Sequence, residues 1–208
     1  NTIWNTPAGW QGTNTDVSGF VSPLVAMQRD WHQTTVVVLG NGGAARAIVA
    51  GCHQLGCDNI HVFGRDVAKL NEWKSSWQGI KLRVTNCDTP TSMMTQTHLW
   101  DELTTFIDRD NLLIVNCTPI GMSPQIEDSP ISAEMLQKVG ANSIAYDLIY
   151  TPRPTKFLQL AAEQGIMAID GTEMLIHQGA IAFELWLQKS APVEMMRQIL
   201  LEHLASAH

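Results

Sequence analysis

The fold is decided by one stretch of the sequence, Val36-Val37-Val38-Leu39-Gly40-Asn41-Gly42-Gly43-Ala44-Ala45-Arg46-Ala47. Its first four residues form a continuous apolar run, which is typical of a strand buried on both faces of a parallel sheet. The glycine-rich turn that follows reads G-x-G-x-x-A and leads into a helix-compatible segment, as a dinucleotide site requires. Gly40 would make the tight turn, and Gly42 would let backbone amides approach a pyrophosphate. Gly43 and Ala44 would open the helix whose N-terminus faces that group.

Working outward from this stretch, short apolar runs alternate with amphipathic segments. Strands are predicted at 36–39, 60–63, 82–84, 112–115 and 144–146, and helices at 43–56, 66–77, 98–107, 132–138 and 154–165. Strict alternation of strand and helix predicts an α/β fold with a doubly wound, Rossmann-like parallel sheet. The ends of the chain depart from this pattern, with helical segments predicted at 17–31, 172–189 and 192–205. These segments belong to no βαβ unit, so we expect a remnant of a smaller domain beside the sheet.

Composition and charge narrow the possible functions of the chain. The 208 residues carry 13 Lys plus Arg against 20 Asp plus Glu, a net charge of −7. An acidic chain without a basic run is not expected to bind nucleic acid or an anionic membrane surface. No stretch approaches the ~20 apolar residues of a membrane span.

The cysteines indicate a reducing compartment. Cys52, Cys57, Cys87 and Cys117 lack CxxC spacing, so we expect reduced thiols in a cytoplasmic protein. A zinc site that includes His53 between the first two cysteines is the alternative. It is disfavoured because a helix would direct these side chains apart. We expect no metal.

The residues after the second predicted strand bear on the choice of cofactor. They are Gly64-Arg65-Asp66, with Lys69 one helical turn later. An acidic residue at this point holds the ribose 2′-hydroxyl of NAD, whereas an Arg accommodates the 2′-phosphate of NADP. Arg65 and Lys69 favour NADP, and Asp66 leaves NAD open. The alternative is that these are solvated loop charges.

Several further motifs lie in order along the chain. They are Asn14-Thr15-Asp16 with Gly19-Phe20, Gly40–Arg46, Asn116–Met122, Tyr146–Tyr150 with Thr151-Pro152 and Thr155, and Asp170–Gln178 with Phe183–Trp186. Together they resemble the shikimate dehydrogenase family, with its motifs N-T-D-x-x-G-F, G-x-G-G-A-x-R, N-x-T-P-x-G-M and Y-D-x-x-Y-x-P-x-x-T. The resemblance extends from Asn1 to Trp186.

The resemblance implies an enzyme of aromatic amino acid biosynthesis that reduces 3-dehydroshikimate to shikimate with NADPH, as a monomer or homodimer. It implies a substrate-domain remnant over 1–16, an NADP-binding domain over 17–171 and C-terminal helices that return to the substrate domain over 172–208. The first lysine is Lys69, so the family's catalytic lysine has no counterpart here. In the family, the serines that bind the substrate carboxylate lie in the same first portion of the substrate domain, and they too have no counterpart here. We therefore expect an absent N-terminal part, and a 208-residue chain that binds NADP but is inactive.

Two alternatives to this function stay open. One is a quinate/shikimate dehydrogenase that uses NAD as well as NADP, which the neighbouring Arg65 and Asp66 permit. The other is a non-catalytic dinucleotide-binding protein that keeps the fold without the chemistry.

The resemblance also assigns site residues. The implied catalytic residue is Asp16, which orients the absent lysine, and the implied substrate-binding residues are Asn1, Asp16, Tyr150 and Gln178. The implied cofactor-binding residues are Gly40, Gly42, Gly43, Ala44, Arg65, Lys69, Asn116, Thr118, Leu148 and Gly171.

Each substrate residue also has an ordinary structural interpretation. Asp16 precedes an amphipathic helix and could be its N-cap, and Tyr150 could be a half-buried tyrosine. Gln178 lies on an apolar helical stripe, where an amide needs a polar partner. That partner is either a substrate hydroxyl or a backbone carbonyl.

Overall fold

A computed structural model describes residues 1–77 and 95–206 of the chain. The predicted strand at 82–84 and Cys87 lie outside these residues. The chain divides into two units: Asn1–Gln28 with Thr172–His208, here called the terminal unit, and Arg29–Gly171, here called the sheet unit. None of the described helices combines the length and apolar composition that crossing a bilayer needs.

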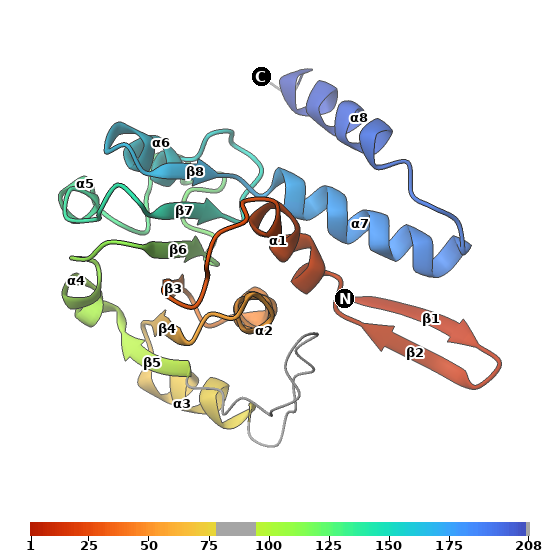
Figure 1. Ribbon diagram of the computed structural model, residues 1–208, viewed down its shortest axis with the longest axis horizontal. Helices are drawn as coiled ribbons and strands as arrows, with labels where there is room; N and C mark the ends of the chain where they lie inside the picture. Colours follow the sequence, from red (N-terminus) through yellow and green to blue (C-terminus); the bar gives the residue numbers. More distant parts are fainter. Residues whose placement is uncertain (78–94, 207–208) are drawn as a thin grey trace. The chain divides into compact units, whose positions relative to one another are not determined.

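The sheet unit is built on six parallel strands, which lie side by side in Figure 1. They are β3 (Thr35–Leu39), β4 (Asn59–Gly64), β5 (Thr95–Leu99), β6 (Leu112–Asn116), β7 (Ile144–Asp147) and β8 (Met167–Ile169). The spatial order is β5-β4-β3-β6-β7-β8, so the direction of winding reverses between β3 and β6. The α/β fold with a doubly wound parallel sheet is confirmed. A ligand is expected at that reversal, beyond the carboxyl ends of the strands.

Helices connect these strands. They are α2 (Gly43–Leu55), α3 (Val67–Ser75), the 3-10 turn η1 (Trp100–Glu102), α4 (Leu103–Phe106), α5 (Ala133–Leu136) and α6 (Lys156–Glu163). The central strands read as apolar runs because both faces are covered: Val36, Val37, Val38 and Leu39 have no exposed surface. The predicted helix over 98–107 is wrong at its start, since His98 and Leu99 end strand β5. Strand β8 was not predicted, because its three residues are weakly buried.

The terminal unit combines a hairpin with three helices. Its elements are β1 (Thr2–Thr6), β2 (Gly9–Thr13), α1 (Asp16–Val25), α7 (Thr172–Leu187) and α8 (Val193–Ser206). The hairpin is antiparallel, with Thr2 opposite Thr13. The indole nitrogen of Trp186 in α7 donates a hydrogen bond to the carbonyl of Ile3 in β1 over 2.9 Å. The sequence predicted neither strand, because the hairpin is mostly exposed and lacks apolar alternation.

Helix α1 packs on α7, and this contact moves the domain boundary. Phe20 and Leu24 of α1 are fully buried. At Gly19 the helices approach so closely that an added Cβ would lie 2.7 Å from the carbonyl oxygen of Met174. Helix α1 therefore lies in the terminal unit. The division falls after Gln28, not after Asp16 as the sequence predicted, because the apolar face of α1 is covered by a helix from the far end of the chain.

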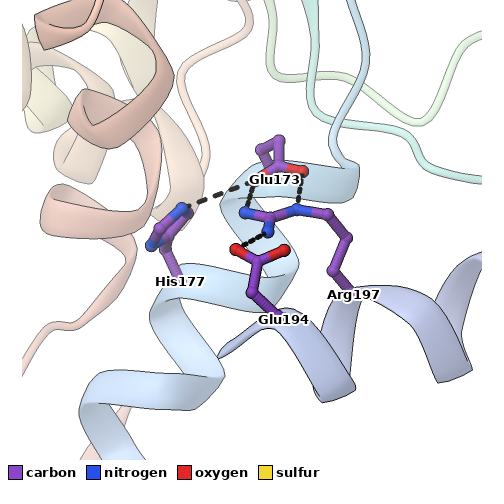
Figure 2. A network of polar contacts seen from close by, with 4 residues as sticks. All are labelled: Glu173, His177, Glu194 and Arg197. Atoms are coloured by element: carbon purple, nitrogen blue, oxygen red, sulfur yellow. Dashed lines mark hydrogen bonds and ion pairs between the residues drawn. The ribbon is translucent and has the colours of Figure 1, made fainter. Parts of the chain in front are cut away.

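A cluster of charged side chains joins α8 to α7 (Figure 2). The guanidinium of Arg197 donates to both carboxylate oxygens of Glu173, over 2.7 and 2.8 Å, and also to Glu194. These carboxylates raise the pKa of Arg197. His177 lies 3.4 Å from the second oxygen of Glu173. Bidentate pairing of this kind fixes geometry as well as charge, so it sets the angle at which α8 crosses the first turn of α7.

Candidate active site

The glycine-rich turn lies where the winding of the sheet reverses. Gly40 follows β3 with φ +103, and its amide donates to the carbonyl of Phe63 in β4 over 2.8 Å. A Cβ at this position would lie 3.0 Å from the methyl carbon of Thr118, which follows β6. The backbone conformation and the close approach both require glycine. The turn is therefore held between the two neighbouring strands.

The N-terminus of α2 faces open space. Gly42 is its N-cap, and no side chain of the described residues caps the helix there. A Cβ built on Gly42 or Gly43 would meet no described heavy atom within 4 Å other than those of its chain neighbours and of the helix's own backbone. The first amides of a helix have no partner within the helix and carry its partial positive charge. A phosphate group fits this position.

A pocket of about 440 Å³ extends from this turn along the carboxyl ends of the strands. It is lined by Gly40, Asn41, Gly42, Gly64, Arg65, Trp100, Cys117, Thr118, Pro119, Ile120, Met122, Ser123, Pro124 and Gln125. Of the predicted cofactor residues, the lining includes Gly40, Gly42, Arg65 and Thr118. It does not include Gly43, Ala44, Lys69, Asn116, Leu148 or Gly171. Trp100, a half-buried aromatic at the end of β5, was not predicted.

The charged residues beside the pocket have distinct roles. The carboxylate of Asp66 accepts a hydrogen bond from the backbone nitrogen of Lys69 over 3.1 Å and so caps α3. The side chains of Arg65 and Lys69 are exposed, and neither forms an ion pair with any residue from 1–77 or 95–206. The carboxylate of Asp66 therefore interacts with the N-terminus of α3. The cationic groups of Arg65 and Lys69 are exposed and can interact with an anion.

The loop after β6 is held by hydrogen bonds from inside. Asn116 is fully buried. Its side-chain oxygen Oδ1 accepts from the backbone nitrogen of Thr118 over 3.0 Å and from the Thr118 hydroxyl over 2.7 Å. Its amide donates to the carbonyl of Ile120 over 3.2 Å. Asn116 therefore shapes the loop from behind, and Thr118 is the member of the pair that lines the pocket.

The loop after β7 carries the predicted residues Leu148 and Tyr150, and Gly171, which follows β8, contacts this loop. The backbone nitrogen of Leu148 donates to the backbone carbonyl of Asn116 over 3.2 Å. The backbone nitrogen of Gly171 donates to the backbone carbonyl of Ile149, also over 3.2 Å. A Cβ on Gly171 would lie 2.1 Å from the carbonyl oxygen of Leu148, so these residues are in contact. Tyr150 follows on the same loop with 42% of its surface exposed. The structure thus brings Leu148 and Gly171 together and leaves Tyr150 accessible.

The predicted substrate residues of the terminal unit form one hydrogen-bonded group. The amide of Asn1 donates to the carboxylate of Asp16 over 2.7 Å, and its carbonyl accepts from the backbone nitrogen of Thr15 over 2.9 Å. The Thr15 hydroxyl lies 3.4 Å from the side-chain carbonyl of Gln178 in α7. Thr15 is the link between them. It belongs to the N-T-D motif, but this role was not predicted because it depends on a contact with α7, far along the chain.

The alternative interpretation of Asp16 as the cap of α1 is wrong. Thr15 is the N-cap residue and Asp16 is the first residue of the helix, where the Asp16 backbone nitrogen bonds the side chain of Asn14 over 3.0 Å. The carboxylate of Asp16 is directed to Asn1. For Gln178, the amide nitrogen donates to the carbonyl of Leu175 over 3.3 Å, so the backbone partner proposed as an alternative is present.

Comparisons with known proteins agree with this arrangement. Residues 171–201 match a family model described as the shikimate 5'-dehydrogenase C-terminal domain. The chain is 53% identical over 202 residues to a shikimate dehydrogenase (NADP(+)) of Microcystis aeruginosa, across 97% of this chain and 67% of that protein. The chain belongs to the shikimate dehydrogenase family.

Solved structures of shikimate dehydrogenases are similar along the same length. A chorismate mutase/shikimate 5-dehydrogenase fusion protein from Clostridium acetobutylicum has a TM-score of 0.79 and 31% identity, covering 99% of this chain and 68% of that one. A shikimate 5-dehydrogenase from Listeria monocytogenes, in complex with shikimate and NAD, has a TM-score of 0.74 and 26% identity, covering 95% and 66%.

In residues 1–77 and 95–206, no group of three His, Cys, Asp or Glu side chains is arranged to hold a metal ion. The donor set at the pocket consists of helix amides, hydroxyls and cationic side chains, which suits phosphate and ribose groups.

Proposed function

We propose that this chain supplies the cofactor site and part of the substrate site for the NADPH-dependent reduction of 3-dehydroshikimate to shikimate. The observation that carries the proposal is the uncapped N-terminus of α2, open at Gly42 and Gly43, with Arg65 beside it on the same pocket. Bound NADPH would supply a hydride. The residues described below bind and orient the two reactants.

The cofactor's phosphates fit two separate positions in the pocket. The amides of Gly42, Gly43 and Ala44 at the start of α2 would receive the pyrophosphate. Arg65, with Lys69 one turn further along, would receive the 2′-phosphate through charge-assisted hydrogen bonds. Asp66 does not oppose this, because its carboxylate caps α3. Trp100 lines the pocket near Arg65 and offers an aromatic face to the purine.

The proposed substrate-binding residues each offer a polar group that suits a substrate hydroxyl or carbonyl. Asp16 is a half-buried carboxylate fixed by Asn1, and it can accept a hydrogen bond from a substrate hydroxyl or hold a cation beside it. Gln178 and Tyr150 offer an amide and a phenol to further hydroxyls. Asn116, Leu148 and Gly171 shape the loops next to the nicotinamide position. We place the reaction in the cytoplasm of the cell, since Cys52, Cys57 and Cys117 are free thiols, with the protein acting as a monomer or homodimer.

The direct test is cofactor binding by calorimetry, followed by shikimate-dependent reduction of NADP+ by the full-length protein. We expect NADP+ to bind more tightly than NAD+, and shikimate to be oxidised in preference to quinate. Failure of NADP+ to bind the chain at all would refute the proposal. Binding without turnover in the full-length protein would favour a non-catalytic dinucleotide-binding protein.

A second candidate is a quinate/shikimate dehydrogenase that uses either cofactor. The observation in its favour is the acidic residue Asp66 directly after Arg65, at the strand end where NAD sites carry a carboxylate. Equal affinity for NAD+ and NADP+, together with oxidation of quinate, would support this candidate instead.

A further inference from the structure

Asp147, at the carboxyl end of β7, is a fully buried carboxylate that none of the roles above uses. Its first oxygen accepts from the side-chain amide of Asn116 over 3.0 Å and from the backbone nitrogen of Ile149 over 3.1 Å. Its second oxygen accepts from the hydroxyl of Thr155 over 2.7 Å. Three donors, one from β6 and two from the loop after β7, therefore converge on one side chain.

Each of these donors lies in, or forms hydrogen bonds to, a loop that the proposed site uses. Asn116 holds Thr118 and Ile120 in the pocket loop, through the bonds described above. Ile149 immediately precedes Tyr150. Thr155 caps α6, since its hydroxyl oxygen accepts from the backbone nitrogen of Leu158 over 3.4 Å.

The two loops also approach each other at Gly121. Gly121, at the end of the pocket loop, has φ +98, and a Cβ built on it would lie 3.8 Å from the side chains of both Ile149 and Thr155. A shift in one loop would therefore be transmitted to the other through the same small region.

We propose that Asp147 is a positioning residue that couples the pocket loop, 117–122, to the Tyr150 loop, 148–155. Through Asn116 it sets where Thr118 lines the cofactor pocket, and through Ile149 and Thr155 it sets where Tyr150 is presented. The inference rests on the proposed function of these loops in binding cofactor and substrate. Asp147 itself touches neither reactant.

The chemistry of the carboxylate explains why an acidic residue stands here. An ionised carboxylate has acceptor sites on both oxygens and no donor, which matches three donors at once. An amide or a protonated carboxyl would place a hydrogen against one of those donors, and an unsatisfied buried group is costly. Charge, and not shape alone, is therefore what holds the two loops together.

The ionisation of Asp147 is balanced close to neutrality. Burial raises its pKa to about 6, against the opposing effect of the three hydrogen bonds. The titratable groups that face it are the thiol of Cys117, whose pKa is itself raised by burial and by this carboxylate, and Asp170, which pairs with Arg153. Below about pH 6 the protonated form would release at least one donor, and the coupling would weaken.

The experiment compares two conservative substitutions in the same pair of strands. Asp147→Asn keeps the shape and removes the charge. Ser143→Ala is the matched control: Ser143 is equally buried at the opposite end of these strands, where its hydroxyl oxygen accepts from the backbone nitrogen of Leu112 over 3.0 Å. Both variants lose one buried polar interaction, so both should melt earlier than the wild type.

Cofactor affinity separates a positioning role from a merely structural one. We expect Asp147→Asn to raise the Kd for NADP+ by about tenfold near pH 7.5, and Ser143→Ala to leave it within about twofold. As the pH falls through about 6, the Kd should rise more steeply in the wild type than in Asp147→Asn, in which only the 2′-phosphate of the cofactor titrates over this range. Equal Kd values in the two variants, or an unchanged pH profile in Asp147→Asn, would overturn the inference.

A second variant covers the case in which Asp147→Asn does not fold. Thr155→Val removes one donor and keeps the carboxylate, which should move the midpoint of the Kd profile to higher pH. An unmoved midpoint would also overturn the inference. These outcomes are distinct from a failure of the proposed function, which would appear as a wild-type protein that does not bind NADP+ at any pH.

Discussion

The hydroxyl of Thr15 lies 3.4 Å from the side-chain carbonyl of Gln178, across the contact between α1 and α7. Thr15 has one hydroxyl proton, and the carbonyl of Asn1, 3.3 Å away, is a second acceptor for it. The backbone nitrogen of Thr15 also donates to the side-chain carbonyl of Asn1, over 2.9 Å. The hydroxyl is therefore shared, and Gln178 is held by long contacts that a substrate hydroxyl could replace.

The first prediction concerns Gln178. Gln178→Ala should raise the Michaelis constant for shikimate by about tenfold in the full-length protein, and should leave NADP+ affinity and melting temperature almost unchanged. Stability is spared because both protein partners of this half-buried amide lie at 3.3 Å or more. Steady-state kinetics and thermal melting of the same preparation provide the measurement.

The control for this variant is Gln188→Ala. Gln188 makes the same kind of backbone contact, from its amide to the carbonyl of Leu185 over 2.9 Å, and it is exposed. Its removal should leave the Michaelis constant unchanged. A Gln178→Ala protein that melts much earlier and binds shikimate normally would show that the residue is structural.

The second prediction concerns cofactor choice. Arg65→Ala should weaken NADP+ by about 1.5–3 kcal/mol, the value of a hydrogen bond to a charged group, and should leave NAD+ nearly untouched. Calorimetric titration with each cofactor measures this. Lys74→Ala, which removes an exposed positive charge at the far end of α3, should change neither affinity. An equal loss for both cofactors would mean that Arg65 supports the loop and does not contact the phosphate.

The third prediction concerns Trp100. Trp100→Ala should weaken NADP+ and NAD+ by the same amount, about 1–3 kcal/mol, because a purine stacked on an aromatic face is common to both. This pattern differs from that expected for Arg65. Trp10→Ala removes a tryptophan that is 76% exposed on the hairpin and should have no effect. Unchanged affinity in Trp100→Ala would exclude the stacking role.

The fourth prediction concerns acid stability and His61. This histidine is 4% exposed, and its ring nitrogens lie 2.8 Å from the side-chain oxygen of Asn59 and 2.9 Å from His98. Burial, with smaller contributions from His98 and Arg109, lowers its pKa to about 4. Because the unfolded chain binds the proton more readily, this contribution to stability is complete above about pH 6.5 and is lost as the pH falls towards about 4.

Urea unfolding at several pH values tests this expectation. Between about pH 6.5 and 4, the wild type should lose up to about 1.4 kcal/mol per pH unit more than His61→Phe. The comparison of two proteins cancels the opposite trend expected from Asp147, which is present in both. Parallel pH profiles would contradict a neutral buried His61.

The parts of the fold that could be predicted from the sequence are those whose signal is local. The stretch from Val36 to Ala47 combines an apolar run, obligatory glycines and a helix start within twelve consecutive residues, so its structure follows from short-range rules. Strand β5, Thr95–Leu99, has mostly polar residues because it forms the edge of the sheet. Its last two residues, His98 and Leu99, fell within the predicted helix over 98–107, an error that only pairing with β4 could correct.

In the candidate site, too, only the features that follow from local sequence and strand order could be predicted. Residues that end parallel strands, such as Thr118 and Tyr150, meet at one edge by topology, and sequence order is enough to place them there. The roles of Thr15, Trp100 and Asp147 depend on which side chains face each other across elements distant in the chain. Local patterns carry no information about such contacts, so the roles of these residues became visible only in three dimensions.

The contact at Gly19 has a consequence for how the protein tolerates substitution. In an ordinary helix, replacing glycine by alanine stabilises the folded state by up to about 1 kcal/mol. At Gly19 the added methyl would meet the backbone of Met174 at 2.7 Å and the side chain of Gln178 at 3.0 Å, and overpacking of this kind costs about 1–3 kcal/mol. The usual ranking of the two residues is therefore inverted there. A redesign that improves helix propensity position by position would push apart the two helices that carry Asp16 and Gln178, and would exchange the close packing of α1 on α7 for a more regular helix.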